Sequence, residues 1–248
     1  MVFIDSHCHL QINFDKDLQA AVDRMRLKNV KALVDSTNKE DYKKVLKICS
    51  SHPKDLFPCI GLNYDDAAKT SDLEKDLLFI EENISKATAI GEIGLDEKYS
   101  FTREEKNKQE KALHAQLEIA EKHNKCVFLH TRKAEEKVLS IIESYSCSKV
   151  LHCFFVPKLV NKALDLNCFI SIPTVKNKEK TKTIQETPLE NLLCETDSPF
   201  LNPFGQGRNE PAFVIEAYKE IVEAKKEDLS QIEQIIYDNN SRALGVKL

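Results

Sequence analysis

The sequence predicts an α/β fold, a single-domain (β/α)8 TIM barrel that spans residues 1–248. Short apolar runs alternate eight times with longer segments of helical periodicity. The length of 248 residues also suits a barrel of this kind, which usually takes roughly 250 residues. Histidines and carboxylates stand at the ends of several of the apolar runs. TIM barrels build their active sites at the carboxyl ends of their strands.

The strands are predicted from the short apolar runs, several of which are rich in Val, Ile and Phe. In chain order they are 2–7, 31–36, 56–62, 88–95, 125–131, 149–154, 168–173 and 191–196. Because a helical pattern follows each of them, the strands should be parallel, with one helix crossing back between each pair. An alternation of this length favours a closed barrel over an open doubly wound sheet.

The helices are predicted from apolar residues that recur at a spacing of three or four positions. In the first helix these are Leu18, Ala21, Val22 and Met25. In chain order the helices lie near 15–28, 39–51, 71–86, 103–123, 134–144, 157–166 and 177–186, and two more near 210–225 and 228–244 close the chain.

The composition restricts the class of protein. The net charge is −4, which argues against a protein that coats a long stretch of duplex through many Lys and Arg contacts. It leaves room for an enzyme that holds one or two phosphates, with metal ions supplying positive charge. The eight cysteines are scattered without a CxxC pair, which is typical of a reduced, cytoplasmic protein. We find no signal peptide and no apolar run near the roughly 20 residues of a membrane span, and we expect a monomer.

A set of histidines and carboxylates ends the predicted strands. His7 and His9 end the first strand, and residues two apart point to the same face of a strand. The others are Glu92, which ends strand four, His130, which ends strand five, His152, which ends strand six, and Asp197, which follows strand eight. One such residue alone would be ordinary, but six that converge on one rim match the nitrogen and oxygen ligands that zinc and related divalent cations prefer. The sequence therefore predicts a metal site.

These motifs carry a resemblance to a known family. The chain resembles the TatD-like deoxyribonucleases of the amidohydrolase superfamily along nearly its whole length. The matching segments are DSHCHL (5–10), GEIGLD (91–96), VFLHTRKA (127–134), LHCF (151–154), LLCETDSPFL (192–201), GRNEP (207–211) and NNSRALG (239–245). The resemblance implies a metal-dependent nuclease that removes nucleotides from DNA, often in the 3′ to 5′ direction, with RNA or other phosphodiesters as further substrates.

The resemblance also implies roles for the six ligands. His7, His9, Glu92 and Asp197 would bind one divalent ion, and Glu92 would bridge to a second ion held by His130 and His152. The ions could be Zn, Mg, Mn or Ni. Two such cations can supply hydroxide near neutral pH and neutralise charge on phosphoryl oxygens. Asp197 is placed to take the proton of the attacking water as a general base, so Asp197 and Glu92 are the expected catalytic carboxylates.

Three residues are candidates for substrate binding. Arg132, two residues after His130, could hold a phosphate through two hydrogen bonds, or it could form a surface ion pair. Arg208 in the GRNEP segment could bind phosphate or brace its loop. Asn63 stands where many members of the family have a histidine that contacts substrate, so phosphate orientation depends on this position.

Two further positions bear on this rim. Phe155 and Val156 follow LHCF where the family usually has Ser-Gly, which predicts a loop of different shape beside His152. Glu195 shares a strand face with Asp197, and we expect it to support the site or to be structural.

Two other functions compete with the nuclease. One is a hydrolase of the same superfamily that acts on an ester or amide, such as an aminoacyl-tRNA linkage. The other is a catalytically weakened scaffold that kept the ligands and lost its fit to substrate.

Overall fold

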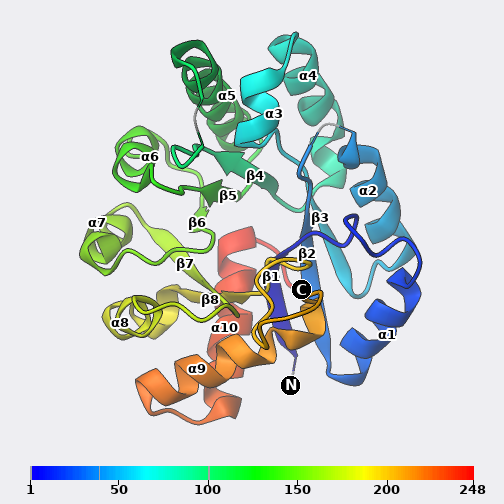
Figure 1. Ribbon diagram of the computed structural model, residues 1–248, viewed down its shortest axis with the longest axis vertical. Coiled ribbons are helices and arrows are strands. Elements are labelled where there is room, and N and C mark those ends of the chain that lie inside the picture. Colours follow the sequence, from blue (N-terminus) through cyan, green and yellow to red (C-terminus); the bar gives the residue numbers. More distant parts are fainter. Residues whose placement is uncertain (1, 39, 100) are drawn as a thin grey trace.

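The strands of the protein form a central ring with helices around it (Figure 1). The computed structural model describes residues 2–38, 40–99 and 101–248. The strands are β1 (Phe3–Cys8), β2 (Val30–Asp35), β3 (Leu56–Cys59), β4 (Ile90–Gly94), β5 (Val127–His130), β6 (Lys149–Leu151), β7 (Cys168–Pro173) and β8 (Leu192–Glu195). Each predicted strand is present, so the alternation was interpreted correctly.

The strand order confirms the TIM-barrel prediction. Strands β1 to β3 form one parallel sheet and β4 to β8 another, with each strand beside its neighbour in sequence. Parallel bridges join the two sheets at both edges, between Cys59 and Ala89 and between Cys8 and Ser198. The His9 N–H also donates to the Ser198 carbonyl at 2.7 Å. The eight strands therefore run round one ring.

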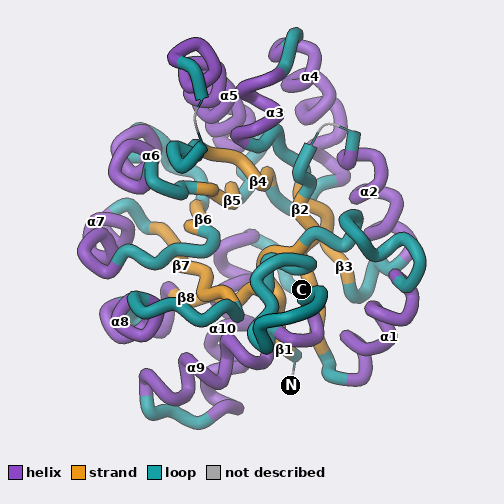
Figure 2. Tube along the Cα trace, in the orientation of Figure 1, coloured by secondary structure: helices purple, strands orange, loops and turns teal. Residues whose placement is uncertain are grey.

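The helices surround the ring, except that α10 lies behind it (Figure 2). They are α1 (Leu18–Leu27), α2 (Asp41–Ser51), α3 (Tyr64–Lys69), α4 (Leu73–Asn83), α5 (Arg103–Lys122), α6 (Glu135–Ile142), α7 (Val160–Asp165), α8 (Lys180–Glu186), α9 (Ile215–Lys225) and α10 (Leu229–Leu244), with short 3-10 turns at Ile84–Lys86, Pro157–Leu159, Leu189–Asn191 and Pro211–Phe213. Apart from α3, which was not predicted, their positions agree with the predictions to within a few residues. The predicted start of the second helix, residue 39, lies outside the described residues.

The third strand is shorter than predicted, because a helix that the sequence analysis missed follows it. Strand β3 ends at Cys59 instead of residue 62, and α3 begins at Tyr64. The side chain of Asn63 accepts the N–H of Asp66 at 2.9 Å and caps this helix. Asparagine is among the best N-cap residues, and acidic side chains in the first turn stabilise a helix by interacting with the positive end of its dipole.

Apolar side chains fill the amino-terminal end of the barrel. Ile4 and Phe128 lie inside the ring, in one buried cluster with Ala243 and Leu244 of α10. Figure 1 shows α10 behind the strands, where it covers this end. Fully burying a side chain such as Ile or Phe contributes about 1.5–3 kcal/mol, so this end is a packed core. The carboxyl ends of the strands are left for polar residues.

The cysteines and the helices have the properties that the composition led us to expect. All eight cysteines are free thiols, and six of them are buried. Burial raises the pKa of thiols such as Cys8 and Cys59 well above the ordinary value, so they pack as small apolar side chains. In the part of the chain that the structure describes, no helix has both the length and the apolar character needed to cross a membrane.

Candidate metal centre

All six predicted ligands lie at the carboxyl ends of the strands. His7 and Glu92 lie within β1 and β4, His130 ends β5, His9 and His152 follow β1 and β6, and Asp197 lies two residues beyond β8. Five of the six are buried, and the Asp197 side chain is 16% exposed. The structure therefore brings together the residues that the sequence analysis selected.

One group of ligands consists of His7, His9 and Asp197. The Nε2 atoms of the two histidines lie 3.1 Å apart. Asp197 Oδ1 lies 3.2 Å from Nε2 of His9 and 3.7 Å from Nε2 of His7. The Asp197 N–H donates to the His7 carbonyl at 2.9 Å, which ties the loop after β8 to β1. Two imidazole nitrogens and a carboxylate oxygen thus converge, as ligands of one divalent ion do.

A second group surrounds Glu92. Its Oε1 lies 2.6 Å from Nδ1 of His130 and 3.4 Å from Nε2 of His152. His7, Glu92 and His152 also offer ligand atoms that all lie within 4.8 Å of one another. His7 therefore faces both groups, whereas the resemblance gave the bridging position to Glu92. The assignment of the six ligands to two separate ions therefore stays a prediction.

Gly94 allows β4 and β5 to approach closely at this point. Its φ is +140°, and a Cβ atom built there would lie 2.0 Å from the His130 carbonyl oxygen. Only glycine fits such a backbone without strain. The GEIG run thereby places Glu92 and His130 on neighbouring strands at contact distance.

Three of the histidines use their second ring nitrogen to bind a supporting oxygen. His9 Nδ1 donates to the Asp35 carbonyl at 2.8 Å. His130 Nε2 lies 2.9 Å from a carboxylate oxygen of Asp96, and His152 Nδ1 lies 3.1 Å from one of Glu195. Such partners fix the orientation of a ligand histidine and leave its other nitrogen for a metal. This contact with His152 favours the first of the two roles considered for Glu195, that of supporting the site. The sequence analysis gave Asp96 no role, although it belongs to the GEIGLD segment.

The electrostatics of the centre favour positive charge. Burial opposes the charged form of His9, but the hydrogen bond and charge of Asp197 outweigh it and raise the pKa of His9 to about 9. Burial likewise opposes a charge on His152, and Glu195 and Glu92 raise its pKa well above the ordinary value. Although burial disfavours its charged form, the pKa of Glu92 is lowered by the charges of His130 and His152.

The donor set fits divalent cations. Imidazole nitrogens and carboxylate oxygens suit zinc and related first-row ions, and carboxylates also suit magnesium. In the described structure, Nδ1 of His130 is buried without a hydrogen-bond partner while it faces Glu92 at 2.6 Å. A cation seated between such atoms would satisfy both of them.

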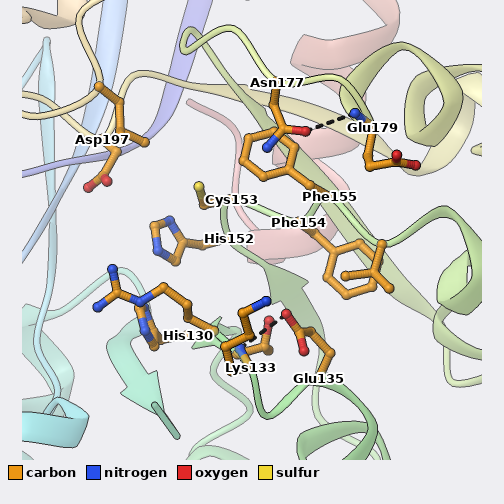
Figure 3. Close-up of a pocket in the computed structure, with 14 residues that line it drawn as sticks. His130, Lys133, Glu135, His152, Cys153, Phe154, Phe155, Asn177, Glu179 and Asp197 are labelled. Atoms are coloured by element: carbon orange, nitrogen blue, oxygen red, sulfur yellow. Dashed lines mark hydrogen bonds between the residues drawn. The ribbon is translucent and has the colours of Figure 1, made fainter. Parts of the chain in front are cut away.

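A cavity of about 440 Å³ opens beside the second group (Figure 3). His130, His152 and Asp197 line it on the side of the centre, and Arg132 and Phe155 are also part of its lining. Arg132 directs Nε and Nη2 to Asp96, at 2.8 and 2.7 Å. Its guanidinium also lies 4.7 Å from the centre of the Tyr99 ring.

The three candidate substrate residues have different surroundings. Arg132 lines the cavity, where a phosphate could reach it, and it also forms an ion pair with Asp96, the other role considered for it. Asn63 is buried and caps α3. Arg208 donates to both carboxylate oxygens of Asp17 and lies 3.9 Å from the centre of the Phe14 ring. These contacts match the second role considered for Arg208, that of a brace for its loop.

Comparisons with known proteins agree with this geometry. The human protein named deoxyribonuclease TATDN3 is 29% identical, covering 95% of this chain and 92% of the relative. The uncharacterized metal-dependent hydrolase YcfH of Escherichia coli K12 is 32% identical, and the match covers 99% of this chain and 97% of YcfH. The crystal structure of the E. coli TatD homolog YJJV superposes with a TM-score of 0.89 at 27% identity and 98% coverage of both chains. The family model described as TatD related DNase matches residues 4–245, and the chain belongs to this family.

Proposed function

We propose that the protein is a divalent-metal-dependent phosphodiester hydrolase that acts on DNA as an exonuclease of the 3′–5′ type. The observation that carries the proposal is the convergence of two ligand groups on one rim, beside a cavity that an arginine lines. The family membership and the name of the human relative support DNA as the substrate.

The residues of the centre suggest how hydrolysis proceeds. Divalent ions bound there would activate water and neutralise charge on the phosphoryl oxygens. We assign the role of general base to Asp197. Burial would raise its pKa, but the hydrogen bond from His9 and the neighbouring histidines hold the pKa below the ordinary value, so the carboxylate is ionised and ready to accept a proton. Oδ1 faces the histidines, which leaves Oδ2 to take the proton of the attacking water.

Glu92 and Arg132 complete the roles. Glu92 contacts His130 and His152 and is placed to hold the two ligand groups at a fixed separation. Arg132 is already oriented by Asp96, so its guanidinium loses little freedom when it binds a phosphate oxygen. Removing a charge-assisted hydrogen bond of this kind costs about 1.5–3 kcal/mol.

Aromatic rings near the ligands favour a single-stranded substrate. Tyr64 stacks on His130 with ring centroids 4.4 Å apart, and Tyr99 beside it is 50% exposed. On the other side, Phe200 is 49% exposed and its ring centroid lies 6.1 Å from that of His9. Nucleobases that have left a duplex stack on such rings, at about 1–3 kcal/mol per base.

The remaining parts of the proposal concern metal, assembly and compartment. Two ligand groups support two ions, drawn from Zn, Mg, Mn or Ni. We also propose that residues 1–248 form one domain that acts as a monomer in the cytoplasm. The free thiols suit a reducing compartment.

The test is a nuclease assay on end-labelled single-stranded DNA, with chelator and then with each of the four metals restored. Asp197→Asn should lower cleavage by at least about 10²–10⁴-fold, the usual loss when one acid–base group is removed, while the variant still binds the DNA. The control is Asp165→Asn, an exposed aspartate at the end of α7, which should cleave like the parent.

The outcomes separate the candidate functions. Products that shorten from the 3′ end support the proposal. The protein would instead be the ester or amide hydrolase considered above if it turns over an ester or amide and cleaves no DNA, RNA or simple phosphodiester with any metal. A protein that binds metal and turns over none of these substrates would be a scaffold.

A further inference from the structure

Asp35, the last residue of β2, is a buried carboxylate that the catalytic scheme leaves unused. Its exposed fraction is 0%. Within the described residues, neither of its carboxylate oxygens has a hydrogen-bond partner. A buried charge without a partner is costly, by several kcal/mol for an ion. A carboxylate kept in such a place therefore calls for a function.

The nearest cationic candidate is the imidazole of His7. Asp35 Oδ2 lies 3.2 Å from Nδ1 of His7, at ion-pair distance, although the ring is turned away from full hydrogen-bond geometry. The opposite nitrogen, Nε2, is the one that faces His9 and Asp197. Asp35 thus stands behind the ligand ring and not among the ligand atoms.

The backbone makes room for this carboxylate. A Cβ atom built on Gly91 would lie 2.5 Å from Asp35 Oδ1 and 2.8 Å from Cβ of Phe128. The glycine directly before the ligand Glu92 is therefore needed for Asp35 to fit. The Asp35 carbonyl oxygen also accepts the Nδ1–H of His9 at 2.8 Å, so one residue contacts both histidines of the His-x-His pair.

A carboxylate also lies behind two of the other ligand histidines. Asp96 lies next to one ring nitrogen of His130, and Glu195 next to one ring nitrogen of His152. In both histidines the other ring nitrogen faces Glu92. A carboxylate in that position holds the proton on one nitrogen, fixes the tautomer and makes the other nitrogen a stronger ligand. Without Asp35, His7 would be the ligand histidine that lacks an acceptor at its outer nitrogen.

We propose that Asp35 is a positioning residue that holds His7 with its proton on Nδ1, and so sets the affinity of the group of His7, His9 and Asp197 for a divalent cation. This inference rests on the proposed metal-dependent function. It concerns metal affinity, so it can be tested without measuring turnover. Losing such a supporting partner typically weakens metal binding about 10–100-fold.

The experiment measures Zn²⁺ affinity by competition with a chromophoric chelator on the full chain. Asp35→Asn keeps the shape of the side chain and removes its charge, and Asp35→Ala removes the acceptor as well. We expect the Zn²⁺ dissociation constant to rise about 10–100-fold in Asp35→Asn and at least as much in Asp35→Ala. The matched control is Asp55→Asn, at the amino-terminal end of β3, where the carboxylate pairs with Arg26 at 2.8 Å. Its Zn²⁺ affinity should equal that of the parent.

Stability of the metal-free proteins distinguishes positioning from packing. Because Asp35→Asn replaces a buried carboxylate whose oxygens make no full hydrogen bond by a neutral amide, the metal-free variant should unfold at the same temperature as the parent or higher. Unchanged Zn²⁺ affinity in both variants would overturn the proposal, and so would a loss of affinity that merely follows a lower unfolding temperature. A parent protein that takes up none of Zn²⁺, Mg²⁺, Mn²⁺ and Ni²⁺ would overturn the metal centre, and with it the role of Asp35.

Discussion

The cap at Asn63 offers a prediction that separates stability from substrate binding. The Asn63 side chain accepts the Asp66 N–H at 2.9 Å and starts α3. Just before it, the amide of Gln116 binds both the N–H and the carbonyl of Leu62, at 2.6 and 3.0 Å. The cap therefore holds a short helix whose first residue, Tyr64, stacks on the ligand His130.

The size of the effect follows from this contact. Replacing an N-cap asparagine by alanine costs about 1 kcal/mol, which lowers the unfolding temperature of a chain of this length by about 2–4 °C. Aspartate caps as well as asparagine. In thermal scans followed by circular dichroism, we therefore expect the unfolding temperature of Asn63→Ala to lie a few degrees below that of the parent. The unfolding temperature of Asn63→Asp should equal that of the parent.

Asn63→His tests the substrate role in the same series. An imidazole caps poorly, so this variant should lose about as much stability as Asn63→Ala. If a histidine here orients phosphate, its KM for single-stranded DNA should fall or its rate should rise, so that activity and stability move in opposite directions. An Asn63→Ala protein as stable as the parent, beside a less stable Asn63→Asp, would refute the cap. Cleavage that Asn63→His leaves unchanged would assign phosphate binding to another group, such as Arg132.

Three further predictions concern the rim. Glu92→Gln keeps the shape of the side chain and removes its charge. The metal content measured by elemental analysis and the turnover should therefore fall, while the unfolding midpoint in urea stays the same. A full metal content would show that Glu92 does not bind metal. Arg132→Ala should raise KM for single-stranded DNA about 10–100-fold, with little rescue by lysine because lysine cannot bind in a bidentate manner; an unchanged KM would show that phosphate binds elsewhere. Gly94→Ala should cost about 3 kcal/mol or more in urea unfolding, since its Cβ would meet the His130 carbonyl oxygen at 2.0 Å; a stable variant would contradict the close approach.

The fold was predictable because its signals are local. Each strand of the barrel is a short apolar run, and each long helix shows its periodicity within its own residues. Helix α3 was missed for a related reason. It has only the span Tyr64–Lys69, too short for periodicity to appear, and its start depends on a cap. The sequence GLNYDD did contain that signal, an asparagine followed by two acidic residues, but the resemblance drew attention to the histidine that Asn63 replaces.

The site was predictable to the extent that its residues end strands. His130 and Asp197 were found in this way, because parallel strands bring their carboxyl ends to one rim. Asp35 ends a strand in the same manner, but an aspartate after an apolar run is also a common loop residue. Its importance depends on the distance to His7 across two strands. Arg208 shows the opposite limit, because the sequence left phosphate binding and a brace both open, and it is the contact with Asp17 that favours the brace.

The charge balance of the rim explains why so many carboxylates are placed there. Among the residues that the structure describes, five carboxylates lie at ion-pair distance from the four ligand histidines: Asp35, Glu92, Asp96, Glu195 and Asp197. With neutral imidazoles this is five negative charges in or beside a buried site, which the interior tolerates only if they are neutralised. Two divalent ions together with the guanidinium of Arg132, which contacts Asp96, supply five positive charges. One ion would leave two negative charges without a partner. In the metal-free protein protons take that place, which is why the pKa values of His9, His130 and His152 are raised. Metal ions and protons therefore compete for the same nitrogens, and this charge count supports the proposal of two ions.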